Sequence, residues 1–438
     1  MDLDSSIMRA AGMRERDRRH VWHTWTPLRE DRAQAMFSHG EGYRVWDVDG
    51  KEYIDATSCA LSAVCGYRHP ELDAAVERQL RRLHHFDLST GSHEPAGLLA
   101  ERISSYLPDG LSRTLFVNSG SEGFEAAMMI AAAHHAHLGR PRSRVVSFAR
   151  GYHGSTLLCR SLSALPRVGH LFEPPLPVTH VELPAAPARL RRPDALQPLM
   201  RAFERAFGDD PGDLPMAVAV EPFLNVGGGI MLPPGFLPAL RRLCDRTGTL
   251  LVLDEIFTGY GRTGRMFAHQ HEPAAEPDIL VTSKGLSGGY VPIGAVTVKE
   301  HLHQGFRHDP VLGGLRYGHT NSGHALACAA ALATLDLLDK HDLPHQAEVL
   351  GARLLERLAP LASTGRVADV RGLGLITVVE LATPEAATRL VAQARRRGLL
   401  LRRQGPEGLA VMAAPPLTID QQGIDTLADR LWLALADQ

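Results

Sequence analysis

Residues 250–298, LLVLDEIFTGYGRTGRMFAHQHEPAAEPDILVTSKGLSGGYVPIGAVTV, decide the fold of this chain. Leu250 to Leu253 form an unbroken apolar run, which is typical of a strand buried on both faces of a parallel sheet. Two carboxylates, Asp254 and Glu255, follow the run directly. Open α/β sheets bind ligands beyond the carboxyl ends of their strands. The pattern therefore predicts an α/β sheet with Asp254 or Glu255 at its ligand-binding edge.

A second apolar run, Ile279 to Val281, ends in Thr282-Ser283-Lys284 and is followed by glycines at 285, 288 and 289. Small residues beside a lysine let a planar ligand approach the backbone. A lysine in a partly dry crevice loses its proton readily, and the free amine can attack a carbonyl carbon to form a Schiff base. Lys284 is therefore the candidate catalytic centre, with a plain surface lysine after a strand as the alternative.

Schiff-base chemistry of this kind is that of pyridoxal phosphate, whose ring nitrogen is usually held protonated by a facing carboxylate. Asp254 would supply that carboxylate. The segments DEIFTGYGRTG (residues 254–264) and SKGLSGGYVPIGAV (residues 283–296) closely resemble the signature of class III (ω-) aminotransferases. The resemblance implies an α/β fold of type I among pyridoxal phosphate enzymes. Such a fold has a large domain with a mostly parallel seven-stranded sheet, and a smaller α+β domain made of both chain ends.

The length of 438 residues and the 44% hydrophobic content predict a large core and two domains. We expect residues 1–68 to form the N-terminal part of the small domain, residues 69–325 the large cofactor-binding domain, and residues 326–438 the C-terminal part of the small domain. The formal charge of −2 and the pI near 6.9 give no sign of nucleic-acid binding. No apolar run is long enough to suggest a membrane span.

The cysteine pattern and the N-terminal residues indicate in which cellular compartment the protein is expected. Five cysteines without CxxC spacing predict reduced, mostly buried thiols and a cytoplasmic protein. The N-terminus lacks the apolar region of a signal peptide. His134, His135 and His137 lie on a predicted helix without a carboxylate at ligand spacing, so no metal site is expected.

Two further motifs follow predicted strands. Asn118-Ser119-Gly120-Ser121-Glu122 opens a helix, and the free N–H groups of such a turn bind phosphate, although a plain N-cap reads the same way. The resemblance implies that Gly120 and Ser121 hold the cofactor phosphate. Tyr152 and His153 lie in a GYHG motif. The resemblance implies that Tyr152 stacks on the cofactor ring, with His153 close by and Ile256 on the opposite face, whereas a tyrosine that merely packs is the alternative.

The resemblance also implies substrate contacts. Trp22, in the aromatic segment HVWHTWTP (residues 20–27), would line the entrance. Leu61 lies in a loop where many relatives carry tryptophan, which predicts a wider pocket. Glu221, after the apolar run Ala217 to Val220, would lie on the substrate side of the cofactor. Its competing interpretation is a structural salt bridge.

An arginine near the C-terminus would bind the substrate carboxylate. Arg402 fits the family pattern better than Arg403, but Pro406-Glu407 leaves the alignment open by one residue. Phe257 replaces the glutamine of ornithine- and aminobutyrate-type members, which argues against those substrates. Thr320, in a GHT segment, would reach the cofactor phosphate of a neighbouring subunit, with a simple N-cap as the alternative. A shared site of this kind implies a homodimer.

The sequence around these motifs also predicts local structure. The Asp49-Gly50 turn predicts a hairpin and Pro70 begins an amphipathic helix. Residues 174–215 are rich in proline and are expected to be irregular. Residues 399–402 and 409–413 are expected to form a strand pair.

These observations predict a pyridoxal phosphate-dependent aminotransferase that moves an amino group from an amine or ω-amino compound to a 2-oxo acid such as pyruvate through a Lys284 Schiff base. Three alternatives stay open. The first is an aminotransferase of a biosynthetic pathway, with an amino sugar, a diaminopelargonate-like compound or another specialised metabolite as substrate. The second is an aminomutase or racemase on the same fold, and the third is a non-catalytic binding protein.

Overall fold

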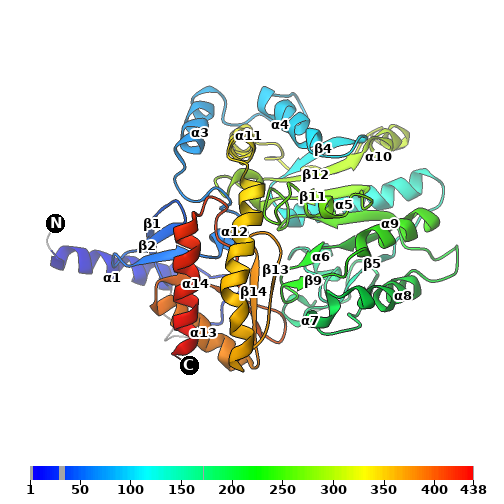
Figure 1. Ribbon diagram of the computed structural model, residues 1–438. Coiled ribbons are helices and arrows are strands. Elements are labelled where there is room, and N and C mark those ends of the chain that lie inside the picture. The colour runs from blue at the N-terminus through cyan, green and yellow to red at the C-terminus, as the bar shows by residue number, and fades with distance from the viewer. Residues whose placement is uncertain (1–2, 29–34, 171, 438) are drawn as a thin grey trace.

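The structure, a computed structural model, describes residues 3–28, 35–170 and 172–437. Its centre is a seven-stranded sheet in the right half of Figure 1. Every pairing in the sheet is parallel except the two made by β12, which runs against its neighbours. In spatial order the strands are β4 (Leu111–Val117), β12 (Gly294–Lys299), β11 (Ile279–Thr282), β10 (Leu250–Asp254), β7 (Ala217–Val220), β5 (Val145–Phe148) and β6 (Val178–Val181).

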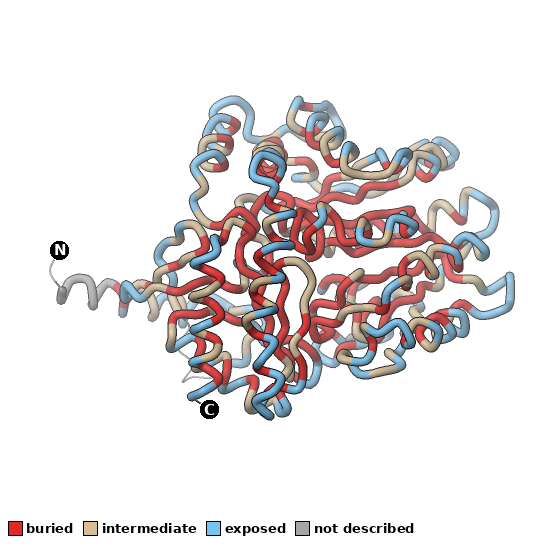
Figure 2. Tube along the Cα trace, in the orientation of Figure 1, coloured by how far each residue is buried: buried red, intermediate tan, exposed pale blue. Residues whose placement is uncertain are grey.

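Helices cover both faces of this sheet, and alternate strand residues point to opposite layers. Val252 and Val281 pack with α5 and its neighbours, whereas Leu251 and Leu253 belong to the core that includes α8 and α9. Figure 2 shows the strands buried between helices that are exposed on their outer sides. The first layer comprises α5 (Gly120–His137), α6 (Leu157–Ser161) and α10 (Glu300–Gly305), and the second α3 (Pro70–Arg82), α4 (Glu94–Ser105), α8 (Leu196–Phe207), α9 (Phe236–Thr247) and α11 (Ala325–Lys340).

Two four-stranded sheets lie beside the central one, with the long C-terminal helices on the left of Figure 1. The first joins both chain ends, because β15 (Leu399–Leu400) pairs in parallel with β3 (Glu52–Asp55), after β1 (Phe37–Glu41) and β2 (Arg44–Asp47). The second is antiparallel in the order β13 (Val367–Gly372), β14 (Thr377–Leu381), β17 (Ala410–Ala413) and β16 (Arg402–Gln404). The expected fold is confirmed: a mostly parallel seven-stranded sheet with a smaller α+β body that contains both chain ends.

Three long helices complete this smaller body, and a set of short elements connects the rest. The long helices are α12 (Leu343–Leu358), α13 (Pro384–Arg396) and α14 (Gln421–Ala436). The other elements are α1 (Leu3–His20), α2 (Ser58–Leu61), α7 (Pro187–Leu190), β8 (Phe223–Leu224), β9 (Ile230–Met231), η1 (Pro166–Val168), η2 (Pro193–Ala195), η3 (Ala268–His271), η4 (Lys284–Ser287), η5 (Phe306–His308) and η6 (Ala359–Thr364).

Two local predictions hold and two are wrong. The hairpin forms at Gly50, whose φ of +82° suits glycine, and α3 begins at Pro70. The segment 174–215 is not irregular, because it supplies edge strand β6 and amphipathic helix α8, whose buried leucine and phenylalanine positions outweigh the proline signal. Residues 399–402 and 409–413 do not form one strand pair. The first two residues, β15, join the N-terminal sheet, and it is β16 that pairs with β17 on one side.

The expected division at residue 325 coincides with the first residue of α11, which packs against α3 and α4 of the central part. The domain boundaries stay a prediction. Within the described residues, no helix is both long and apolar enough to cross a membrane.

Candidate active site

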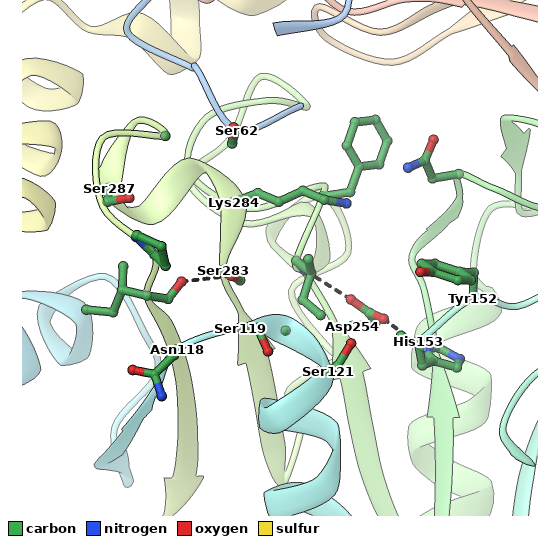
Figure 3. A pocket seen from close by; sticks show the side chains of 18 of the residues that line it. Ser62, Asn118, Ser119, Ser121, Tyr152, His153, Asp254, Ser283, Lys284 and Ser287 are labelled. Carbon is green, nitrogen blue, oxygen red and sulfur yellow. Dashed lines mark hydrogen bonds and ion pairs between the residues drawn. The ribbon is translucent and has the colours of Figure 1, made fainter. Parts of the chain in front are cut away.

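A pocket of about 390 Å³ opens at the carboxyl ends of the central strands. Strands β4, β5, β7, β10 and β11 each lead directly into residues that line it. Figure 3 shows Lys284 and Asp254 facing this pocket, with Ser119 and Ser121 at the start of α5. The structure therefore brings together Lys284, Asp254, Gly120, Ser121, Tyr152, His153, Ile256 and Glu221.

Lys284 is the first residue of η4 and has a φ of +34°, a left-handed backbone that is strained for a side chain of this kind. The chain has only four lysines, and all four are described. Lys51, Lys299 and Lys340 each have a hydrogen-bond or ion-pair partner, whereas Lys284 has none among the described residues, and its Nζ lies 5.9 Å from the Phe257 ring centroid. Desolvation lowers the pKa of Lys284 and outweighs the opposing effects of Asp254 and Glu221.

Asp254 is held in place from two sides. Its Oδ1 accepts a hydrogen bond from Ile256 N at 3.0 Å, and its Oδ2 lies 2.7 Å from Nδ1 of His153. Nε2 of His153 is in turn 3.2 Å from Ser147 Oγ. This buried chain fixes the direction of the carboxylate and of the imidazole together.

Glu255 has a different environment from its neighbour. It is fully buried and accepts hydrogen bonds from Thr258 Oγ1 and from the backbone N–H groups of Ala268 and His269, and it also contacts the His269 ring. It does not line the pocket. Of the two carboxylates that the sequence left open, Asp254 is the one that faces the pocket.

The start of α5 presents free donors to the same pocket. Ser119 caps the helix by accepting from Glu122 N at 3.2 Å, so part of the N-cap alternative is true. The backbone N–H groups of Gly120 and Ser121 have no acceptor among the described residues, and both residues line the pocket. Two free N–H groups at the positive end of an 18-residue helix form a site for an anion.

Glycines keep this part of the pocket open. A Cβ on Gly120 would lie 2.4 Å from Cδ1 of Ile256, and a Cβ on Gly154 would lie 2.4 Å from Oγ of Ser121. Tyr152 lines the pocket, and its backbone N–H donates to Oε1 of Glu221 at 2.9 Å. This bond fixes the backbone of Tyr152 relative to the side chain of Glu221.

Glu221 is buried and tied to backbone. Its Oε2 accepts from Asn225 N at 3.1 Å, and no ion pair joins it to Arg402. Burial, and then the charge of Asp254, raise the pKa of Glu221 to about 7. Asn225 Oδ1 accepts from Nε2 of Gln404 at 3.0 Å, and this bond connects the turn after β8 to β16.

Arg402 and Arg403 are adjacent on β16 but differ in their partners. Arg403 donates to Pro384 O and Thr388 Oγ1 of α13. The side chain of Arg402 makes no hydrogen bond or ion pair with any described residue. Partial desolvation, and then the nearby charge of Arg167, lower the pKa of Arg402, and its charge in turn lowers that of Lys284. The free guanidinium near the pocket is therefore that of Arg402.

Four predicted site residues do not line the pocket: Arg402, whose surroundings are given above, and Trp22, Leu61 and Thr320. Trp22 is 85% exposed and lines a neighbouring hollow, and Trp25 rather than Trp22 contacts Tyr152, with ring centroids 6.3 Å apart. Leu61 is 3% exposed in an apolar cluster with Phe257. Thr320 lines a separate hollow of about 820 Å³, and its carbonyl oxygen contacts Nε2 of His85.

The turn before Ser62 gave no signal in the sequence. Ser58, Cys59, Ala60 and Leu61 all have positive φ, between 45° and 76°, without a glycine among them. Asp55 holds this turn by accepting from Thr57 N, Thr57 Oγ1, Cys59 N and Tyr67 Oη. The turn carries Ser62 into the pocket wall, a contact that propensity rules do not predict.

The comparisons with known proteins agree with this site. A family model described as aminotransferase class-III matches residues 27–435. The chain belongs to the class III aminotransferases. The adenosylmethionine-8-amino-7-oxononanoate aminotransferase of Nitratidesulfovibrio vulgaris is 36% identical over 96% of this chain and 80% of its own length. The putrescine aminotransferase of Pectobacterium atrosepticum is 35% identical over 86% of this chain and 77% of its own.

Solved structures point the same way. An (S)-enantioselective ω-transaminase from Thermomicrobium roseum has a TM-score of 0.90 and 31% identity, and the match covers 98% of both chains. The ω-transaminase of Pseudomonas jessenii in complex with PMP has a TM-score of 0.91 and 31% identity over 97% of this chain and 98% of its own. This class III aminotransferase is a pyridoxal phosphate-dependent transaminase of fold type I.

The residues present fit that cofactor. The pocket offers an unpartnered amine for an aldehyde, a carboxylate for a ring nitrogen, and free helix N–H groups for a phosphate. The glycines at 120 and 154 leave room that side chains would fill. Sequence reasoning missed Ser62 and Asn225, which line the pocket, and Gln404, which donates to Asn225 from β16.

Proposed function

We propose that this transaminase moves an amino group from an amine or ω-amino compound to a 2-oxo acid such as pyruvate, with Lys284 as the lysine that bonds to the cofactor. The observation that carries the proposal is the unpartnered Nζ of Lys284 in the same pocket as Asp254. The other three lysines are engaged elsewhere. When bound, pyridoxal phosphate supplies an aldehyde carbon and an electron-accepting ring.

Other pocket residues would hold that group. Gly120 and Ser121 would bind the phosphate through their N–H groups, and Tyr152 and Ile256 would pack on the two ring faces. Asp254 would face the ring nitrogen. His153 keeps the carboxylate of Asp254 in one orientation through the 2.7 Å contact.

Lys284 also handles a proton. Because desolvation lowers its pKa, Nζ can be a neutral amine and accept a proton. As general base it would take the proton from the substrate carbon that bears the amine, and as general acid it would deliver that proton to the cofactor carbon that receives the amine. The carboxylate of Asp254 would stabilise positive charge that faces it.

The substrate and the second subunit follow from residues around this centre. Arg402 would bind the carboxylate of the 2-oxo acid, because a free guanidinium can make two parallel hydrogen bonds to it. Trp22 would contact the substrate at the entrance, and Leu61 would shape the pocket wall from behind Phe257. We further propose a homodimer in which Thr320 reaches the cofactor phosphate of the other subunit. Thr320 lines a separate hollow and not the Lys284 pocket of its own chain, which supports that role.

A screen of amine donors tests this proposal. The purified holoenzyme is mixed with single amines and no acceptor, and the absorbance of the bound cofactor is followed. We expect loss of that absorbance with at least one amine, and its return on adding pyruvate. If the absorbance is lost but no 2-oxo acid restores it, the result would contradict transamination and favour an aminomutase or racemase.

A further inference from the structure

The pocket wall beside Glu221 carries a side-chain amide to which the proposed function gives no role. Asn225 lies between β8 and β9, lines the Lys284 pocket and is only 4% exposed. Its Oδ1 accepts from Nε2 of Gln404 at 3.0 Å, whereas its Nδ2 has no acceptor among the described residues. That nitrogen is not sealed inside the protein, so its N–H groups are open to the pocket.

The backbone of Asn225 is held as firmly as its side chain. Its N–H donates to Oε2 of Glu221 at 3.1 Å, and its carbonyl oxygen accepts from the N–H groups of Gly228 and Gly229. Arg371, which is buried on β13, donates in turn to the carbonyl oxygens of these two glycines. Because the turn and the amide are both tied to buried groups, the free N–H groups of Nδ2 have a fixed direction.

Most other side-chain donors of the pocket are already committed. Three hydroxyls donate to backbone carbonyl oxygens, those of Ser62, Ser283 and Ser287. His153 has a partner at each ring nitrogen. Lys284, Tyr152 and the turn at 118–121 have their proposed roles at the cofactor. Asn225 is therefore the uncharged donor left for a substrate among the described residues that line the pocket.

Asn225 also lies close to the reacting amine. Phe223, two residues before it, has its ring centroid 6.1 Å from that of Phe257, and the Phe257 centroid lies 5.9 Å from Nζ of Lys284. Glu221, which accepts from Asn225 N, is near enough for its charge to act on Lys284. An oxygen that binds to Asn225 would therefore belong to the part of the substrate next to the reacting carbon.

We propose that Asn225 recognises the substrate through an uncharged oxygen near the reacting amine, which accepts a hydrogen bond from Nδ2. The substrate class is then the amines that carry a hydroxyl or ether oxygen on the carbon next to the amine-bearing carbon. An amine with a methyl or methylene group in place of that oxygen would leave the amide without a partner. This inference rests on the proposed function and adds a specificity-determining residue to it.

Two pairs of donors with matched shapes test the proposal in the half-reaction without acceptor. 1-Amino-2-propanol is compared with isobutylamine, and 2-methoxyethylamine, whose oxygen can only accept, with butylamine. Wild type should favour the oxygen-bearing member of each pair in kcat/KM by about threefold to tenfold, as expected for one neutral hydrogen bond. Asn225→Leu should remove both preferences. Gln422→Leu, the same exchange at an exposed position of α14, should keep them.

Each comparison is made within one variant, so a general loss of folded protein cancels in the ratio, and Asn225→Ala replaces Asn225→Leu if the latter does not fold. No preference in wild type, or preferences that survive in the Asn225 variants, would overturn the proposal. A preference for the alcohol without one for the ether would also overturn it, because the pocket would then offer an acceptor rather than a donor.

Calorimetry of the same amines with the Lys284→Ala protein loaded with cofactor measures binding without turnover. We expect the same preferences there, and their loss when Asn225→Leu is combined with Lys284→Ala. If no amine reacted with wild type, the proposed function would be contradicted, and the calorimetric preferences would still decide the role of Asn225.

Discussion

Two neighbouring carboxylates at the end of β10 have different surroundings. Asp254 faces the pocket and contacts His153, whereas Glu255 points into the protein and accepts bonds from η3. Successive residues of an extended chain point to opposite sides, so only one of the two can face the ligand. The sequence placed the acid at this edge, but the hydrogen bonds of Glu255 with residues 268–269 are long-range contacts that one sequence does not reveal.

Substitution of each carboxylate should therefore affect a different property. Asp254→Asn removes the charge that faces the pocket, so we expect the rate of the amine half-reaction to fall by on the order of 10²–10³. Glu255→Gln should leave that rate near wild type and lower the free energy of unfolding by roughly 1–3 kcal/mol, because it weakens buried hydrogen bonds. Stopped-flow absorbance and urea unfolding measure the two effects. If Glu255→Gln slowed the half-reaction and Asp254→Asn lowered only the stability, Glu255 would be the partner of the cofactor.

Glu221 gives the molecule a pH dependence of known sign. Burial raises its pKa to about 7 in the folded protein, above the ordinary glutamate value of 4.5. The folded state therefore binds more protons than the unfolded state between these values, and this group's contribution to stability is present below pH 4.5 and lost as pH rises through 7. Glu221→Gln stays neutral, so its stability relative to wild type should increase from pH 5 to pH 8. Thermal unfolding of both proteins across that range checks the prediction, and a constant difference would show that Glu221 ionises normally.

At the scale of elements, the sequence predicted those parts whose signal is local. The buried runs that became β7, β10 and β11 were found because strands covered on both faces are continuously apolar. The left-handed turn at 58–61 was not found, because Asp55 and the surrounding fold impose it against the preference of its residues. The separation of β15 from β16 was missed for a similar reason, since pairing with β3 depends on the far end of the chain.

Strand β16 carries Arg402 and is fastened to the pocket by the turn between β8 and β9. Gln404 donates to Asn225 at 3.0 Å, and Gly405 N donates to Val226 O at 3.0 Å. Gln404→Leu leaves Oδ1 of Asn225 buried without its partner, which costs about 1–3 kcal/mol of stability.

If this contact positions Arg402, the same variant should raise the KM for pyruvate several-fold with little change in the half-reaction of an uncharged amine. Gln404→Glu offers no comparable N–H donor and should behave similarly, whereas Gln404→Asn tests the length of the side chain. Equal losses with both substrates would make Gln404 purely structural.

At the scale of the whole molecule, the sites of two subunits should depend on each other. Thr320 lies away from the Lys284 pocket in its own chain. Thr320→Ala should therefore weaken cofactor retention, and Thr320→Ser, which keeps the hydroxyl, should restore it.

Mixed dimers decide whose site Thr320 serves. Neither the Lys284→Ala nor the Thr320→Ala homodimer should retain full activity at limiting cofactor. A heterodimer of the two should regain one intact site if Thr320 serves the other subunit. Absence of recovery, or a fully active monomer in sedimentation, would contradict a shared site.

The central claim is that Lys284 bonds to the cofactor, and reduction with borohydride tests it most directly. The chain has lysines only at 51, 284, 299 and 340, so peptide mapping by mass spectrometry can assign the adduct without ambiguity. We predict that the reduced holoenzyme carries the cofactor on the peptide containing Lys284, that Lys284→Ala abolishes both adduct and turnover, and that Lys340→Ala changes neither. An adduct on Lys51, Lys299 or Lys340, or full turnover in Lys284→Ala, would contradict the account.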